Sequence, residues 1–139
     1  MAPTASIDET VLRTIQGTLA DWPEIDRAAF EPSYDDPRLL RAIPDGALYP
    51  ATVVEARLDV RWFRNGDFSI HYVESWRDGT RRECRWDRHE NPHGDRLHFH
   101  PLPDAGGATG LDPPTDARDL VPAVVQWSVE RGDSLYDRE

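Results

Sequence analysis

Residues 52–87, TVVEARLDVRWFRNGDFSIHYVESWRDGTRRECRWD, contain three segments in which apolar and polar residues alternate. Alternation with a period of two predicts β-strands that bury one face. The pairs Asn65-Gly66 and Asp78-Gly79 stand between the segments, and such pairs are typical of hairpin turns. The stretch therefore predicts an antiparallel sheet built from consecutive hairpins.

The loop length at each hairpin decides which side chains face the core. A three-residue loop at 64–66, with Gly66 in the left-handed conformation, sets Trp62 opposite Phe68 and separates apolar from polar side chains. A two-residue turn there would mix the two faces. The same loop length at 77–79 separates the faces of the second hairpin, so both hairpins predict one register.

This register predicts a polar sheet face with the side chains of an acid–base site. It sets Asp59 opposite His71, where the carboxylate can orient the imidazole and raise its basicity, as a general base requires. Arginine forks on the same face suit phosphate. The predicted catalytic residues are His71, Asp59, His98 and His100, the phosphate-binding residues are Arg57, Arg61 and Arg85, and Asp87 supports them.

The flanking segments supply two helices. Ser6 is expected as the N-cap of the first helix. Asp119 is expected as the N-cap of the last, with Pro122 in its first turn and Gly132 at its end. We predict one α+β domain, residues 1–139, with both helices packed on one face of about four antiparallel strands. Its parts are a helix at 7–21, a Pro-rich connector at 23–50, the sheet at 52–100, with its last strand near 96–100, a loop at 101–115 and a helix at 116–131.

The charge is unevenly distributed. The chain has 26 acidic and 16 basic residues, all of the latter Arg, which indicates an acidic protein from a halophilic source or from a GC-rich genome. Residues 57–96 hold nine Arg and eight acids, whereas the remainder holds seven Arg and 18 acids. All five His fall within residues 71–100. A segment rich in Arg and His within an otherwise acidic sequence indicates an anion-binding site.

Several classes of protein are disfavoured. No apolar run is long enough for a membrane helix and no leader opens the chain, so we expect a cytoplasmic protein with no membrane partner. Cys84 stands alone, which leaves no intrachain disulfide and no Cys-based zinc site, and a lone Cys most often packs in the core. Phosphate-binding loops, nucleophile elbows and metalloprotease motifs are absent.

A metal site is the alternative use of the histidines. His89, His93, His98 and His100 can offer imidazoles to a metal, although their spacing matches no dense zinc signature. Ordinary cross-strand ion pairs also explain much of a polar face. We expect no cofactor, with zinc or manganese on His71, Asp87, His98 and His100 as the runner-up.

The order of short motifs resembles a known family. Arg57-Leu-Asp59, Phe68-Ser-Ile-His71-Tyr72, Arg85-Trp86-Asp87 and the His- and Pro-rich stretch 89–101 are similar to the TumE-like toxins of toxin–antitoxin systems. The resemblance covers residues 55–103 and leaves the N-terminal 50 residues outside. It implies a central antiparallel sheet and a cognate, DNA-binding antitoxin as partner. Its matching positions are Arg57, Asp59, His71, Arg85, Asp87, His98 and His100.

The leading hypothesis is a toxin that cleaves RNA without a tightly bound metal. His71 would take the proton of the 2′-hydroxyl group, His98 or His100 would protonate the leaving oxygen, and Arg61 and Arg85 would stabilise the phosphate charge. One alternative is a non-catalytic interaction protein that binds a basic, DNA-binding partner. The other is a metal-dependent nuclease. Edge strands in so small a sheet also make a homodimer plausible.

Overall fold

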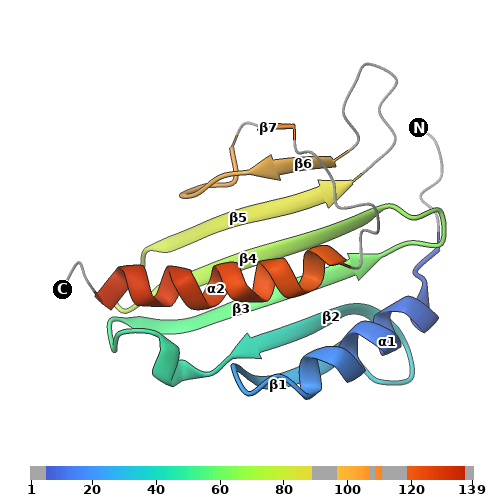
Figure 1. Ribbon diagram of the computed structural model, residues 1–139, viewed down its shortest axis with the longest axis horizontal. Coiled ribbons are helices and arrows are strands. Elements are labelled where there is room, and N and C mark those ends of the chain that lie inside the picture. The colour runs from blue at the N-terminus through green and yellow to red at the C-terminus, as the bar shows by residue number, and fades with distance from the viewer. Residues whose placement is uncertain (1–5, 89–96, 107–108, 111–118, 137–139) are drawn as a thin grey trace.

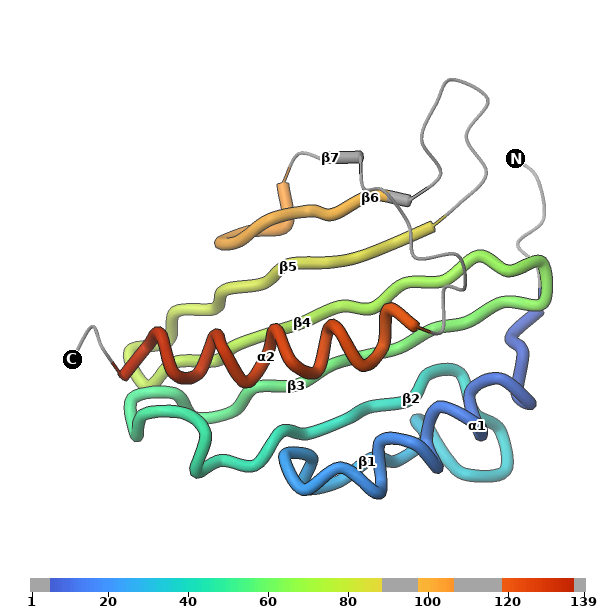
Figure 2. Tube along the Cα trace, in the orientation of Figure 1, coloured from blue at the N-terminus to red at the C-terminus, as the bar shows by residue number. Residues whose placement is uncertain are grey.

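The computed structural model describes residues 6–88, 97–106, 109–110 and 119–136. Within them one antiparallel sheet of seven strands follows the order of the chain, and two helices pack on one of its faces (Figures 1 and 2). The α+β class and the placement of the helices are confirmed, but the sheet is larger than the four strands expected. The elements are α1 (Glu9–Ala20), β1 (Ile25–Pro32), β2 (Pro37–Pro44), the 3-10 turn η1 (Gly46–Leu48), β3 (Val53–Trp62), β4 (Phe68–Trp76), β5 (Arg81–Arg88), β6 (Leu97–His100), β7 (Thr109–Gly110) and α2 (Leu120–Tyr136).

The predicted hairpin register is confirmed. Trp62 pairs with Phe68 across β3 and β4, and their rings stack with centroids 4.6 Å apart. Both hairpins turn through three residues, and Gly66 and Gly79 each have φ of +88°. That left-handed backbone carries no steric penalty for glycine, which explains why the Asn-Gly and Asp-Gly pairs mark these loops.

The Pro-rich segment 23–50 is not a connector, and this expectation was wrong. It forms the hairpin β1–β2 and then η1. Three of its prolines end or begin a strand: Pro32 closes β1, and Pro37 and Pro44 bound β2. Proline is tolerated at strand ends and on edge strands, because a missing N–H group there removes no essential ladder bond.

The first helix begins two residues later than expected. Asp8 is its N-cap, and the Asp8 carboxylate accepts a hydrogen bond from the Val11 amide at 3.1 Å. The residue expected as the cap, Ser6, instead accepts a hydrogen bond from the Arg64 amide through its carbonyl oxygen. Ser6 and Ile7 thus lie against the β3–β4 loop, and the helix starts only after this contact.

The last helix begins at Leu120, directly after the expected N-cap Asp119, but it does not end at Gly132. It continues to Tyr136. Gly132 serves packing: a Cβ atom at this position would collide with the carbonyl oxygen of Leu48 in η1. The glycine that resembled a helix stop is therefore the point where α2 crosses η1 most closely.

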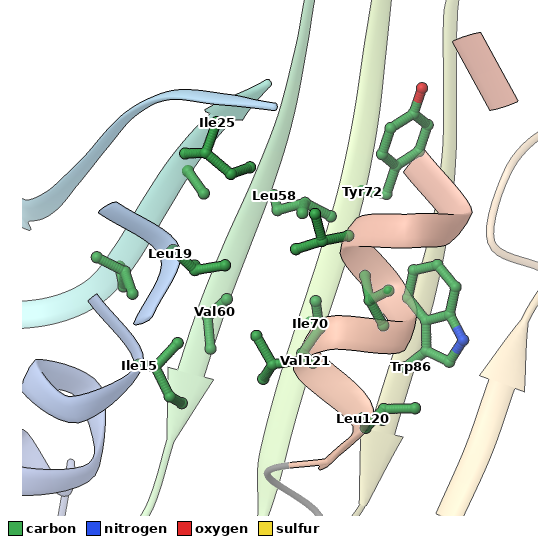
Figure 3. Packing of buried hydrophobic residues seen from close by; sticks show 14 of the residues in the cluster. Ile15, Leu19, Ile25, Leu58, Val60, Ile70, Tyr72, Trp86, Leu120 and Val121 are labelled. Atoms are coloured by element: carbon green, nitrogen blue, oxygen red, sulfur yellow. The ribbon is translucent and has the colours of Figure 1, made fainter. Parts of the chain in front are cut away.

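The core lies between the helices and one face of the sheet (Figure 3). Trp86 and Cys84 are 6% and 0% exposed, which confirms that both belong to the core. Burial raises the pKa of the Cys84 thiol to about 12. Helix α2 contributes Trp127, whose ring meets Tyr72 and Trp86 edge to face. This packing leaves the other face of the sheet without a helix among the described residues.

The segment after β5 differs in part from the expectation. The predicted strand near 96–100 is confirmed as β6. The predicted loop 101–115 includes a short strand, β7, which pairs with β6. In the part of the chain that is described, no helix has the length and apolar character to cross a membrane.

Candidate active site on the polar face of the sheet

A continuous row of polar side chains crosses the sheet on the face away from the helices. Arg41, Asp59, His71, Arg85 and His100 are successive cross-strand partners from β2 to β6. Side chains paired in this way lie about 5 Å apart at Cβ. The row therefore places Arg85 between His71 and His100, and it confirms the predicted pairing of Asp59 with His71.

At one end of the row, Asp59 is bound by two arginines. Arg41 donates to the two carboxylate oxygens of Asp59 at 2.8 and 3.2 Å, and Arg57 donates to one of them at 3.3 Å. Asp59 is 4% exposed, and its hydrogen bond raises the pKa of Arg41. Arg41 was missed because its segment was taken for a connector. The carboxylate expected to orient His71 thus has two cationic partners of its own.

His71, the next residue of the row, lies close to the carboxylate of Glu83 rather than being bound by Asp59. Its Nε2 atom lies 3.5 Å from Oε1 of Glu83, and this buried nitrogen has no hydrogen-bond partner. Burial lowers the pKa of the imidazole below 6.5, against the opposing charges of Glu83 and Asp59. His71 is therefore neutral at neutral pH, which is the state a general base needs.

At the other end of the row, Asp87 draws three side chains together. Arg85 donates to its Oδ2 at 2.9 Å, and Nε2 of His100 lies 3.1 Å from the same oxygen. His98 approaches the other oxygen at 3.9 Å. Asp87 is 7% exposed, so this carboxylate holds the three side chains around it in place.

The predicted residues therefore fall into neighbouring groups. His71, Arg85, His100, His98 and Asp87 surround one part of the face, whereas Asp59 and Arg57 gather beside Arg41. Arg61 lies in the adjacent row, which continues through Ser69 and Asp87 to His98. Glu83 was not predicted, although its alternation with Arg85 and Asp87 places it on the same face.

The runner-up metal set receives no geometric support. Among the described residues, which include His71, Asp87, His98 and His100, no three His, Cys, Asp or Glu side chains are arranged to hold a metal ion. The other two histidines considered, at positions 89 and 93, lie outside the described residues.

Fold and site together define a small α+β protein that presents His, Arg and Asp side chains on the helix-free face of an antiparallel sheet. The chain belongs to the TumE toxin family, since the family model described as Toxin TumE matches residues 23–132. This confirms the resemblance and widens it: the match extends well beyond residues 55–103 and begins at 23, so β1 and β2 are part of the family's pattern. No curated protein and no solved structure matched the chain.

Proposed function

We propose that this toxin acts by cleaving RNA on the polar face of its sheet. The observation that carries the proposal is that His71 and His100 flank Arg85 in one cross-strand row. Neighbouring strands are about 4.8 Å apart, so the two histidines are separated by roughly 10 Å at the backbone. Side chains rising from these positions can reach opposite sides of one phosphodiester group, with the guanidinium group beneath it.

Each group has a distinct role in the proposed reaction. His71 accepts the proton of the 2′-hydroxyl, whose oxygen attacks phosphorus. The bond from phosphorus to the 5′-oxygen breaks, and His100 gives that oxygen a proton. Arg85 stabilises the negative charge that grows on the phosphoryl oxygens. The products are a 2′,3′-cyclic phosphate and a 5′-hydroxyl end.

The test uses purified full-length chain and two matched oligonucleotides, one of RNA and one with 2′-deoxyribose throughout. We expect cleavage of the RNA alone, with 2′,3′-cyclic phosphate ends, and we expect the rate to be unchanged by excess EDTA. Cleavage of both oligonucleotides, or loss of cleavage with EDTA, would contradict this mechanism. The latter result would support the metal-dependent alternative.

The position of His71 predicts a pH dependence. The base must be neutral, so the acidic limb of the cleavage rate should fall below pH 6.5, because burial lowers the pKa of His71. The negative charge of Glu83 opposes this shift, and therefore Glu83→Gln should move the limb to still lower pH. The control is Glu31→Gln, an acid of strand β1 near the far end of the sheet, which should leave the limb in place. A limb that moves upward, or that stays fixed in Glu83→Gln, speaks against His71 as the base.

A second candidate, a non-catalytic binding module, is favoured by one specific observation. The two arginines of the row, and Arg81 beside it, already have carboxylate partners in the pairs Arg41–Asp59, Arg85–Asp87 and Arg81–Glu83. Such pairs reduce the positive potential available to RNA. Membership of a toxin family suggests an antitoxin partner, and we propose that this partner is a basic, DNA-binding protein. A stable complex of the chain with such a partner, together with no cleavage of RNA, would select this candidate.

A further inference from the structure

A hollow of about 220 Å³ lies at the end of the sheet where β2 and β3 separate. The register between these strands covers three pairs, from Leu40–Val60 to Ala42–Leu58. Beyond Ala42, residues from β1, β2, η1 and the start of β3 line the hollow instead. The lining residues are Asp26, Ile43, Pro44, Gly46, Tyr49, Val53, Val54, Glu55 and Ala56.

The lining of this hollow is mixed: apolar side chains such as Ile43 and Val54 stand beside polar surface that includes two carboxylates. Val54 is 61% exposed and is one of three large hydrophobic side chains that the described residues leave exposed. Exposed apolar side chains at a concave site mark binding surfaces more often than isolated ones do. The two acids are Asp26 and Glu55, and the side chain of Glu55 is 46% exposed. Arg57 approaches Glu55 only to 3.9 Å, so its charge remains largely available.

The size of the hollow selects the kind of occupant. An apolar cavity of about 150 Å³ holds a benzene molecule, and small-molecule pockets usually exceed about 300 Å³. The hollow, at about 220 Å³, therefore suits one large aliphatic or aromatic side chain. A peptide that adds to a sheet gains main-chain hydrogen bonds along the strand and specificity from pockets that take its side chains.

We propose that the hollow docks an extended segment of a basic protein partner, with one apolar side chain inside and Lys or Arg over Asp26 and Glu55. Charge complementarity supports this occupant, because the chain carries a net charge of −10 and its excess of acids lies outside residues 57–96. The docking site differs from the polar row, since none of the lining residues belongs to it.

The test is a titration of the ¹⁵N-labelled full chain with a five-residue peptide that has lysine at both ends, valine beside each lysine and leucine in the centre. We expect the amide signals of Gly46, Val54 and Glu55 to shift on addition of this peptide. An otherwise identical peptide with glutamate at both ends should bind at least tenfold more weakly, because the carboxylates at the hollow would repel it.

Two variants with the same change in net charge separate docking from general attraction. Val54→Lys should weaken binding of the basic peptide at least tenfold, whereas Tyr34→Lys should not, because Tyr34 is another exposed apolar residue that does not line the hollow. Equal weakening by both variants, or no shift around the hollow in the wild type, would overturn the proposal. Val54→Lys should still cleave RNA if the proposed activity is correct, so failure of docking and failure of catalysis are distinguishable.

Discussion

Replacing His71 with alanine is expected to abolish growth arrest when the chain is expressed, and to lower the rate of RNA cleavage by about 10²- to 10⁴-fold. The imidazole of His71 is neutral at neutral pH because burial lowers its pKa, and the Glu83 carboxylate 3.5 Å from its Nε2 atom can orient the ring. The measurements are growth after induction in a salt-adapted host and the cleavage rate of purified protein at neutral pH.

His100→Ala and His98→Ala make this prediction sharper. His100 shares the row of His71 and Arg85, whereas His98 lies in the adjacent row. We therefore expect His100→Ala to match the loss in His71→Ala, and His98→Ala to retain most of the cleavage. If the His71→Ala protein still arrests growth, the chain is toxic but the proposed role of His71 as the base is contradicted. Thermal unfolding of each variant near the wild-type temperature is the control for folding.

The strands that carry the row could be predicted because their pattern is local. In β3 and β4, apolar and polar residues alternate up to a glycine that turns the chain, and one register alone separates the two faces. In β2 the pattern is obscured, because the adjacent residues Leu39 and Leu40 are both buried although they point to opposite faces. Because of these two neighbouring apolar residues and the nearby prolines, the strand was not predicted, and Arg41 was therefore not recognised as part of the polar face.

The partners within the polar face depended on side-chain conformations that a register does not determine. Asp59 is directly opposite both Arg41 and His71, and its hydrogen bonds go to Arg41 and Arg57. Glu83 is a diagonal neighbour of His71, close enough for a long side chain to reach. Alternation thus predicted which residues share the face, and the rotamers decide which of them form pairs.

A buried acid on the opposite face has a partner that no local pattern could identify. Glu74 is 0% exposed beneath α2, and Arg131 donates to its two oxygens at 2.7 and 3.0 Å. Tyr72 and Trp76 also donate to this carboxylate. Burial by itself would raise the pKa of Glu74, but the hydrogen bonds from Arg131, Tyr72 and Trp76 outweigh it and hold the pKa below 4.5.

Arg131→Met is expected to lower the free energy of unfolding by about 3–5 kcal/mol, the usual cost of leaving one member of a buried ion pair uncompensated. Urea unfolding at pH 7 and constant salt measures the change. The matched control is Arg38→Met, which removes an ion pair to Asp36 whose side chains are 69% and 67% exposed, and which should cost less than about 1 kcal/mol. The double variant Glu74→Gln, Arg131→Met should recover part of the loss, because no charge is then left buried and the amide oxygen can still accept a hydrogen bond from Tyr72 or Trp76.

The same pair predicts a reversal of the pH dependence. In the wild type, the folded protein lowers the pKa of Glu74 below its ordinary value of 4.5. The ionised carboxylate therefore contributes its full stabilisation above pH 4.5, and this stabilisation is lost as the pH falls through the folded-state pKa. Without Arg131, burial should dominate and raise the pKa of Glu74 above that of the unfolded chain. Glu74 in the variant should then bind a proton on folding, so acid should raise the variant's free energy of unfolding through this site. The stability deficit of Arg131→Met relative to the wild type should therefore shrink as the pH is lowered from 7 toward 4. A deficit that stays constant over this range would show that Arg131 stabilises the fold by packing and not through the charge of Glu74.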